Sequence, residues 1–358
     1  MARKTIAPTT GLHSPVDIAE AKALAPLYGP KTPEKACPPP PAPIRDIEAR
    51  AFYSDASHSI EDPAIVQANR QSLRPLREYV NRIERLTESY LATGNRDNAA
   101  CALTWLESWA AADALLGTMK ERRQAGFERK WMLGALALPF SALKETPGVC
   151  TGNAACDRIG AWFKRIALDV QKDYGPAKRA NPKNTSARNN HQNWAGATVM
   201  LAAVAADDAE LFDWAKERFK DGLTEIQADG SLPLEVSRGQ RAIHYHVFAL
   251  TPMLMMAATL QRNASGLSEA DIASLRRLAN RVRDDLADPA YMAAKTGITQ
   301  ETVRTGDGKL RPDKIAWAEP WYRLTQDASV LPLLKDGRPI TQTSLGGNWT
   351  LFFGQRLP

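Results

Sequence analysis

The segment NNHQNW, residues 189–194, places amides, an imidazole and an indole directly ahead of the apolar run AGATVMLAAVAA. On a helix, Asn190 and His191 each lie three or four residues from Trp194, so all three side chains can face the same way. Asparagine at a helix start is also an ordinary capping residue, because its amide oxygen accepts a bond from an orphan backbone N–H group. We assign that role to Asn189, whereas for Asn190 and His191 the pattern leaves capping and chemistry equally open.

A second group of reactive side chains lies in the later segment DGSLPLEVSRGQRAIHYHVFAL. Ser237 and Gln240 fit a capping box, which predicts a helix with Arg238 in its first turn. Arg238, Arg241 and Tyr245 are then spaced i, i+3 and i+7 on one face of that helix. Two guanidiniums and a phenol on one face could bind an anion, although a solvated basic face with a core tyrosine fits the pattern equally well.

Three of the five histidines, His191, His244 and His246, fall in these two segments and raise the question of a metal site. Side chains two residues apart on a helix point in nearly opposite directions, and no Asp or Glu lies at a helical spacing that would complete a ligand set. We therefore expect no metal and no cofactor.

The elements that must position these residues are predicted to be helices, beginning near residue 63. Helical spacing is clearest in two sets of apolar residues, Val80, Ile83, Leu86 and Tyr90, and Leu103, Leu106, Trp109 and Ala110. Further helices are expected over 122–145, 155–173, 190–206, 208–228, 237–261 and 267–286, between Gly, Pro, Asn and Asp residues. This succession has no fixed repeat and no strand pattern before the C-terminal part, and it predicts an all-α fold, either an α/α toroid or a large bundle.

The chain divides by composition into three parts. Residues 1–45 include the run CPPPPAP and predict an extended arm, because proline blocks helices and central strands. Residues 46–335 form the helical domain, and 336–358 are interpreted as a C-terminal tail. At the start of that domain, 46–62 is polar and aromatic without a helical stripe, which fits a mobile loop over a cleft or a plain surface loop.

Charge and hydropathy limit the partners. Lys and Arg exceed Asp and Glu by six, which favours a polyanionic partner. The charges are scattered and do not form the blocks typical of a nucleic-acid binder, so we expect none. The chain also contains no run of eighteen apolar residues, so we expect no membrane span, and its N-terminus lacks the apolar core of a signal peptide.

Four cysteines allow three pairings, and none lies in a zinc-binding spacing. An even count without metal spacing favours disulfides and an oxidising compartment. Cys150 and Cys156 flank the turn-forming TGNAA, so a local bond is plausible, and Cys37 with Cys101 would then tie the arm to the helical domain. Four reduced core thiols are the alternative.

The sequence resembles the alginate lyases of polysaccharide lyase family five. The resemblance runs from about residue 52 to 325 and includes, in the family's order, NNHQNW, LFDWA, GSLPLEVSRGQRAIHYHVFAL and, more weakly, KIAWAEPWYR. It implies an incomplete α/α toroid with a long substrate groove and a lid loop near 50–62. It also implies secretion to the periplasm, an anionic polysaccharide as the substrate and no metal. We expect a monomer, since nothing in the sequence requires more.

The resemblance also implies roles for individual residues. Asn190, His191 and Arg238 would neutralise a uronate carboxylate, with His191 at the reacting C5, and Tyr245 would transfer the proton. A further set would bind substrate: Tyr53 in the lid loop, Gln124, Trp131, Trp194, Glu235 and His244, to which the basic stripe adds Arg241.

These residue types suit β-elimination from a uronate. Removing the C5 proton builds negative charge next to a carboxylate, and an amide and a guanidinium can offset that charge as an oxyanion site does. A tyrosine base needs its pKa lowered by a cation such as Arg238, so we expect a neutral to alkaline optimum. In mannuronate and glucuronate the C5 proton and the 4-O leaving group lie on the same face, so one tyrosine could serve as base and acid. Guluronate presents the opposite geometry and should react poorly.

The sequence departs from many relatives of the family at Gly239 and Gln192, where basic residues are common. We therefore expect a broad polyuronate lyase acting on poly-mannuronate, glucuronan and hyaluronan. Two other functions remain open. An α/α-barrel glycoside hydrolase would need two carboxylates, for which Glu235 and Glu319 are candidates. A non-catalytic binder of acidic glycans would need only the arginines and tryptophans.

Overall fold

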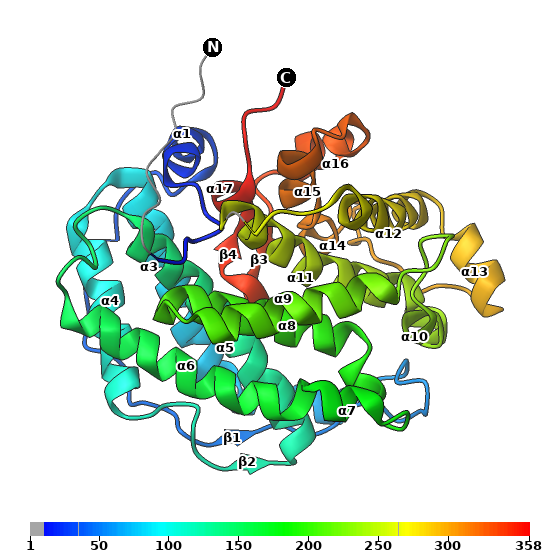
Figure 1. The fold of residues 1–358 in the computed structure, drawn as a ribbon, viewed down its shortest axis with the longest axis horizontal. Coiled ribbons are helices and arrows are strands. Elements are labelled where there is room, and N and C mark those ends of the chain that lie inside the picture. Colours follow the sequence, from blue (N-terminus) through cyan, green and yellow to red (C-terminus); the bar gives the residue numbers. More distant parts are fainter. Residues whose placement is uncertain (1–10, 35, 264) are drawn as a thin grey trace.

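The computed structural model describes residues 11–34, 36–263 and 265–358. The helices predicted from apolar spacing form close to the expected positions (Figure 1). They are α2 (Pro63–Ser72), α3 (Arg74–Thr93), α4 (Arg96–Ala111), α5 (Arg122–Glu145), α6 (Ala154–Tyr174), α8 (Asn190–Ala206), α9 (Ala209–Thr224), α11 (Ala242–Arg262) and α12 (Glu269–Ala287). The shorter helices are α7 (Pro176–Ala180), α10 (Pro233–Val236), α13 (Ala290–Thr296), α14 (Pro312–Ile315), α15 (Ala318–Thr325) and α16 (Leu331–Gly337).

These helices pack in two layers. The inner layer runs from α3 to α5, α8, α11 and α15, each of which contacts the next. Outer helices α4, α6, α9 and α12 cover it, with α4 against α6 and α9 against α12. The architecture is the predicted α/α toroid, and strands add only two short pairs among the described residues, β1 (Ile47–Glu48) with β2 (Met119–Lys120) and β3 (Thr341–Gln342) with β4 (Gly347–Asn348).

The two ends of the chain differ from the sequence predictions. The extended arm is wrong for α1 (Ile18–Tyr28), whose N-terminus is capped by Asp17 and whose Leu24 is fully buried. The C-terminal tail is also wrong, because α17 (Trp349–Phe353) is buried throughout. Helix α1 packs against α3 and α17, and α17 packs against α15, so the two ends close the inner layer between its first and last helices. The prolines misled the prediction because most of them follow α1.

The start of α11 also differs from the prediction. The expected capping box is absent, since the Ser237 hydroxyl donates to the backbone oxygen of Leu234 and ends α10. Gly239 then adopts a positive φ of 56°, which favours glycine, and a single 3-10 turn precedes Ala242. Arg238 therefore lies in the bend before α11 and not in its first turn.

Helix α8 is the centre of the fold. It is apolar on all sides and packs against α5, α6, α9 and α11, as expected of a helix inside a large core. The segment Gly239–Arg262, which includes α11, is long and apolar enough to cross a membrane, but 83% of its apolar window is buried inside the protein. Its hydropathy is accounted for by its place in the core.

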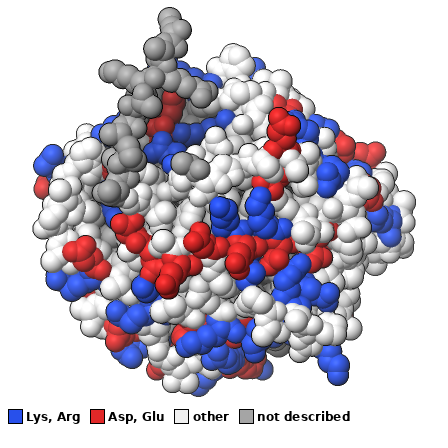
Figure 2. All heavy atoms as spheres, viewed as in Figure 1, with Lys and Arg blue, Asp and Glu red and all other residues white. Residues whose placement is uncertain are grey.

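Charges of both signs are interspersed on the face drawn in Figure 2. Acidic side chains gather across the middle of that face, with Lys and Arg around them. This face carries no continuous basic patch, in agreement with the scattered charges of the sequence.

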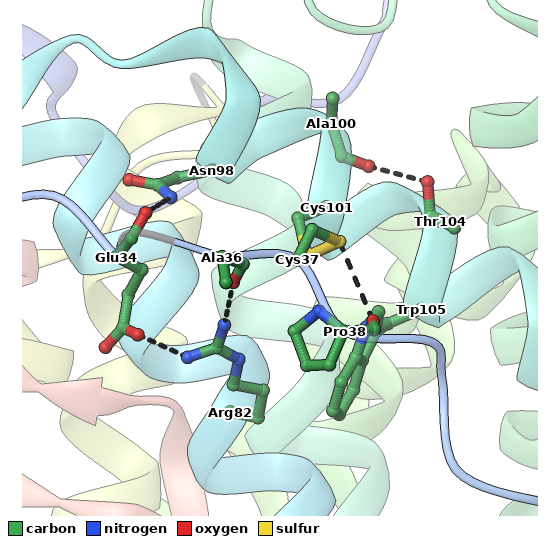
Figure 3. Close-up of a disulfide and its surroundings, with 10 residues drawn as sticks. All are labelled: Glu34, Ala36, Cys37, Pro38, Arg82, Asn98, Ala100, Cys101, Thr104 and Trp105. Carbon is green, nitrogen blue, oxygen red and sulfur yellow. Dashed lines mark hydrogen bonds and ion pairs between the residues drawn. A yellow bond between two sulfur atoms is a disulfide. The ribbon is translucent and has the colours of Figure 1, made fainter.

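Both predicted disulfides are present, and no cysteine is free among the described residues. Cys37 bonds to Cys101 on α4 and fixes the proline-rich segment to the helical layers (Figure 3). Next to it, Asn98 donates to the backbone oxygen of Glu34 at 2.9 Å, and Arg82 donates to that of Ala36 at 2.6 Å. Cys150 and Cys156 form the local bond at the start of α6.

The two disulfides should differ in their effect on stability. Cys37 and Cys101 are 64 residues apart, and Cys150 and Cys156 are six. Closing the longer loop removes more entropy from the unfolded chain, so replacing both cysteines with alanine should cost about 4 kcal/mol for the first pair and about 2 kcal/mol for the second. Urea unfolding of the two double variants measures this difference, and a larger loss for the short loop would contradict it.

Candidate active site

A cavity of about 640 Å³ lies between the 50–62 segment and the first turns of α5, α8 and α11. Eight of the eleven predicted site residues line it: Tyr53, Gln124, Trp131, His191, Arg238, Arg241, His244 and Tyr245. Three do not, namely Asn190, Trp194 and Glu235. Spacing in two distant segments singles out His191, Arg238, Arg241 and Tyr245, and the family resemblance adds the other four.

Tyr245 and Arg238 are in direct contact within this cavity. The guanidinium carbon of Arg238 lies 3.5 Å from the centre of the Tyr245 ring. The Tyr245 hydroxyl is 2.5 Å from the hydroxyl of Tyr53, and Arg241 Nη1 donates to the latter at 2.8 Å. Because Arg241 can only donate, the proton of Tyr53 is available to Tyr245, an arrangement that favours a phenolate at Tyr245. Arg241 is held in turn by ion pairs with two glutamates, Glu61 and Glu301.

The pKa of Tyr245 corrects the expectation from sequence. Burial raises this pKa above the ordinary value for tyrosine, and the nearby charges of Arg238 and Arg241 only partly oppose the rise. Burial raises the pKa of Tyr53 further. Tyr245 is therefore a neutral phenol in the free protein at neutral pH. The prediction that Arg238 brings the pKa below its usual value is wrong for the unliganded site.

The 50–62 segment covers the cavity and is bound to Arg238. Arg238 Nε donates to the backbone oxygen of Ser57 at 2.9 Å, and Nη2 donates to that of His58 at 2.8 Å. Gln240 donates to the backbone oxygen of Ser59 at 3.1 Å. Arg238 thus joins the segment to α11, and its Nη1 is the nitrogen that makes no such bond.

His191 begins α8 on the opposite wall, where Asn189 caps the helix as predicted. Its ring stacks on Phe127 with the centroids 3.7 Å apart. Burial and the charges of Lys130 and Arg238 hold the pKa of His191 well below its usual range. A neutral imidazole adds no positive charge, so the expectation that His191 helps neutralise a carboxylate is wrong as a statement about charge. It can still donate a hydrogen bond.

Two of the cavity histidines, His191 and His244, have a buried lysine beside Nδ1. Lys130 Nζ lies 3.5 Å from Nδ1 of His191, and Lys314 Nζ lies 3.0 Å from Nδ1 of His244. Burial and the lysine charge also hold the pKa of His244 well below its usual range. Burial lowers the pKa of the lysines as well, well below the usual range for Lys130. Where the lysine donates to Nδ1, the ring proton lies on Nε2. Neither lysine could be predicted from the sequence, because the two pairs are 61 and 70 residues apart and no spacing connects them.

Asn190 and Glu235 form a buried pair behind the wall. The Asn190 side-chain amide donates to both carboxylate oxygens of Glu235 at 3.0 Å, and its backbone N–H donates to one of them at 2.7 Å. Burial raises the pKa of Glu235 to about 7 despite these bonds. Glu235 therefore anchors the start of α8, where a carboxylate is favoured by the helix dipole. Neither side chain lines the cavity of the unliganded protein, and the contacts of both residues with substrate stay predictions.

Other predicted residues also serve the packing. Trp194 is fully buried and donates from its indole to the backbone oxygen of Phe248, so its predicted substrate contact is wrong. Trp131, which does line the cavity, packs edge-on against both of these rings. Gln124 lines the cavity and donates to Glu128 at 3.1 Å. Gln192 faces α9, so its departure from the family pattern does not reach the cavity.

Two alternatives from the sequence can also be placed. Both ring nitrogens of His246 bond to the backbone, at Ala242 and Leu232, so this histidine is structural. Among the residues that the structure describes, no group of three or more His, Cys, Asp or Glu side chains could hold a metal ion. Glu319 is buried in an ion pair with Arg338 and does not line the cavity, so it forms no hydrolase pair with Glu235 there.

Comparison with known proteins relates the whole architecture to one group. A family model described as alginate lyase matches residues 46–291. A polysaccharide lyase of Stenotrophomonas maltophilia is 34% identical over 88% of this chain and 90% of its own length. An alginate lyase of Azotobacter vinelandii is 31% identical over 98% and 90%, and one of Cobetia marina is 33% identical over 91% and 87%.

Solved structures share the fold at lower identity. A histidine-to-alanine variant of alginate lyase A1-III, complexed with tetrasaccharide, superposes with a TM-score of 0.78 at 24% identity over 96% of both chains. Alginate lyase A1-III from Sphingomonas species A1 gives a TM-score of 0.74 at 23% identity over the same share. At this identity the likeness establishes the fold.

Removing the Glu235 carboxylate should destabilise the start of α8. Glu235→Ala leaves the buried backbone N–H of Asn190 without an acceptor, so the free energy of unfolding should fall by about 1–3 kcal/mol. Glu235→Gln is the matched control, because its amide oxygen can still accept that bond and Asn190 can turn its own amide to accept from the new N–H group. Urea unfolding should rank wild type, glutamine and alanine in that order, and equal losses for both variants would contradict the anchoring role.

Proposed function

The chain belongs to the alginate lyase family, and from this premise we propose that it cleaves 1,4-linked uronate polymers by syn β-elimination. In this reaction a proton leaves C5 of a uronate, the bond from C4 to its glycosidic oxygen breaks, and a double bond forms between C4 and C5. The oxygen leaves with a proton. Side chains, and no metal ion, would offset the charge that develops on the carboxylate.

The contact between Arg238 and Tyr245 is the observation that carries this proposal. A phenol and a permanent cation lie together on the wall of a cavity large enough for sugar residues, which supports proton transfer beside a bound anion. The Nη1 of Arg238, which the covering segment does not use, would hold the uronate carboxylate. His191, with its proton on Nε2, would donate a second hydrogen bond to the developing enolate. Donors fixed in a water-poor site stabilise such charge more than water does.

Tyr245 would act as both base and acid. Its phenol is neutral in the free protein, so a fraction must ionise before it can accept the C5 proton. The hydroxyl of Tyr53 and the charges of Arg238 and Arg241 favour that ionised form. After accepting the proton, Tyr245 would return it to the departing 4-oxygen on the same face of the sugar. Asn190 and Glu235 would support the reaction indirectly by fixing the start of α8 and hence His191.

The proposed substrates follow from this geometry. Mannuronate and glucuronate present the C5 proton and the 4-oxygen on the same face and differ only at C2, so poly-mannuronate, glucuronan and hyaluronan are all candidates. Guluronate presents these groups on opposite faces and should react poorly. The broad substrate range is proposed on stereochemistry alone. Gln192 does not reach the cavity, so its difference from the family gives no support to that range.

The location of the reaction is proposed from the disulfides. Structural disulfides form and persist mainly in oxidising compartments, and we infer that the enzyme works in the periplasm or outside the cell. An anionic polysaccharide is the expected partner there.

Incubation with separate uronate polymers tests the reaction type. Poly-mannuronate, glucuronan and hyaluronan should each yield products that absorb in the ultraviolet, because elimination creates a double bond conjugated to the carboxylate. Polyguluronate should give far less. A hydrolase would release reducing ends without this absorbance, and no product from any polymer would remove the lyase proposal.

Substituting Tyr245 separates the lyase from a non-catalytic binder. Tyr245→Phe retains the ring that Arg238 contacts but lacks the hydroxyl, so kcat should fall at least about 100-fold while polymer binding persists. Phe248→Leu is a control on the same helix that retains the Tyr245 hydroxyl, and its kcat should fall much less. Residual turnover near the wild-type rate in Tyr245→Phe would exclude this residue as the base.

The pH dependence should report the ionisation of Tyr245. Because its pKa is raised, the phenolate fraction grows about tenfold for each pH unit through the neutral and mildly alkaline range, and kcat/KM should rise with it. His191 and His244 are already neutral there and should add no limb. Tyr53→Phe removes a donor to the phenolate and should move the rising limb to higher pH. A profile that falls from pH 6 to 8, or an unmoved limb in Tyr53→Phe, would contradict this assignment.

A further inference from the structure

A second pocket of about 320 Å³ opens beside the active-site cavity, and we propose that it is a subsite for another uronate of the bound polymer. This inference rests on the proposed function, because it extends the same substrate along the protein. The pocket lies between the first turn of α5, the end of α6 and the segment from α7 to α8. None of the residues assigned to proton transfer or to the carboxylate at the cleavage site lines it.

The pocket adjoins the cavity. Arg123, Phe127 and Ser186 line both of them, so the two share a wall. Arg123 Nη2 donates to the Ser186 hydroxyl at 3.3 Å and lies over the Phe127 ring at 5.9 Å. The same Phe127 ring stacks on His191, which places the pocket directly past the proposed reaction centre. A chain that leaves the cavity on this side would enter the pocket.

The charge of the pocket favours an anion. Three cations line it, Arg122, Arg123 and Lys178, against one carboxylate, Asp173. Arg122 neutralises that carboxylate at a distance of 3.5 Å. Lys178 makes no ion pair within the described part of the chain, and it is exposed to solvent. Two positive charges are therefore left for a ligand.

The other lining residues favour a sugar acid over a simple anion. Phe127 and Tyr174 offer ring surface, and Asn184 and Ser186 offer polar groups that can bond to hydroxyls. A polyuronate carries one carboxylate on every residue, so a polymer that reaches the pocket necessarily brings a negative charge into it. Short oligomers that fill only the cavity would gain no affinity from the positive charges of this pocket.

The test removes charges that belong to this pocket alone. Arg122 and Lys178 do not line the main cavity, so the double variant Arg122→Gln/Lys178→Gln leaves the reaction residues intact. Both positions are exposed, and Arg122 lies in the first turn of α5, where the helix dipole does not favour a cation. Lys335→Gln is the matched control, because it removes an exposed charge from α16, which Figure 1 places far from α7.

Kinetics on long and short substrates should separate the outcomes. For long poly-mannuronate, the double variant should raise KM about fivefold with kcat unchanged, and weaken the dependence of KM on salt. For the shortest oligomer that is cleaved, KM should stay within about twofold of wild type. Lys335→Gln should match wild type on both substrates.

Three results would overturn the subsite. They are an unchanged KM on the polymer, an equal rise on polymer and short oligomer, and an equal effect in Lys335→Gln. If inorganic phosphate binds to wild type but not to the double variant, and polymer KM is the same in both, the pocket would be assigned to a free anion instead. If wild type cleaves no polymer, the proposed function fails, and the subsite is then judged by direct binding of poly-mannuronate to wild type and the double variant.

Discussion

The site depends on the guanidinium of Arg238 lying 3.5 Å from the centre of the Tyr245 ring. The same arginine donates to the backbone of Ser57 and His58, so one side chain fixes both the covering segment and the phenol. Burial would otherwise leave Tyr245 too weak an acid to serve as a base. The charge of Arg238 and the hydroxyl of Tyr53 lower the pKa of Tyr245, but they do not fully offset the rise that burial causes. The result is a phenol that is neutral at rest and prepared to ionise beside a bound anion.

Neutral imidazoles complete this arrangement. Burial, together with a lysine beside each Nδ1, holds the pKa of His191 and His244 well below the usual range, so both rings are uncharged. Their contribution is therefore directional hydrogen bonding, while permanent charge comes from the arginines. Such a division suits a reaction in which charge develops on a carboxylate already held by a guanidinium, because donors in fixed positions need not reorganise as the charge grows.

Sequence spacing predicted what is local and missed what is brought together by the fold. The apolar run after Asn189 gave the central helix and its cap. Arg238, Arg241 and Tyr245 line the cavity together, although the first two precede α11 and do not share a helix face with Tyr245. The lysines behind the histidines could not be found, since Lys130 and Lys314 lie in other helical segments. The family resemblance assigned Glu235 to the substrate, yet its carboxylate accepts from Asn190. The direction of the Tyr245 pKa also escaped prediction, because burial is a property of the whole core. Composition failed at both chain ends, where α1 and α17 close the ring.

A crystal structure of Tyr245→Phe with a bound mannuronate tetrasaccharide tests the central claim most directly. The account predicts that a uronate carboxylate contacts Nη1 of Arg238 and Nε2 of His191. It further predicts that the C5 hydrogen and the 4-oxygen both face the position of the missing hydroxyl. A C5 hydrogen directed away from residue 245, or a carboxylate bound outside the reach of Arg238, would contradict it.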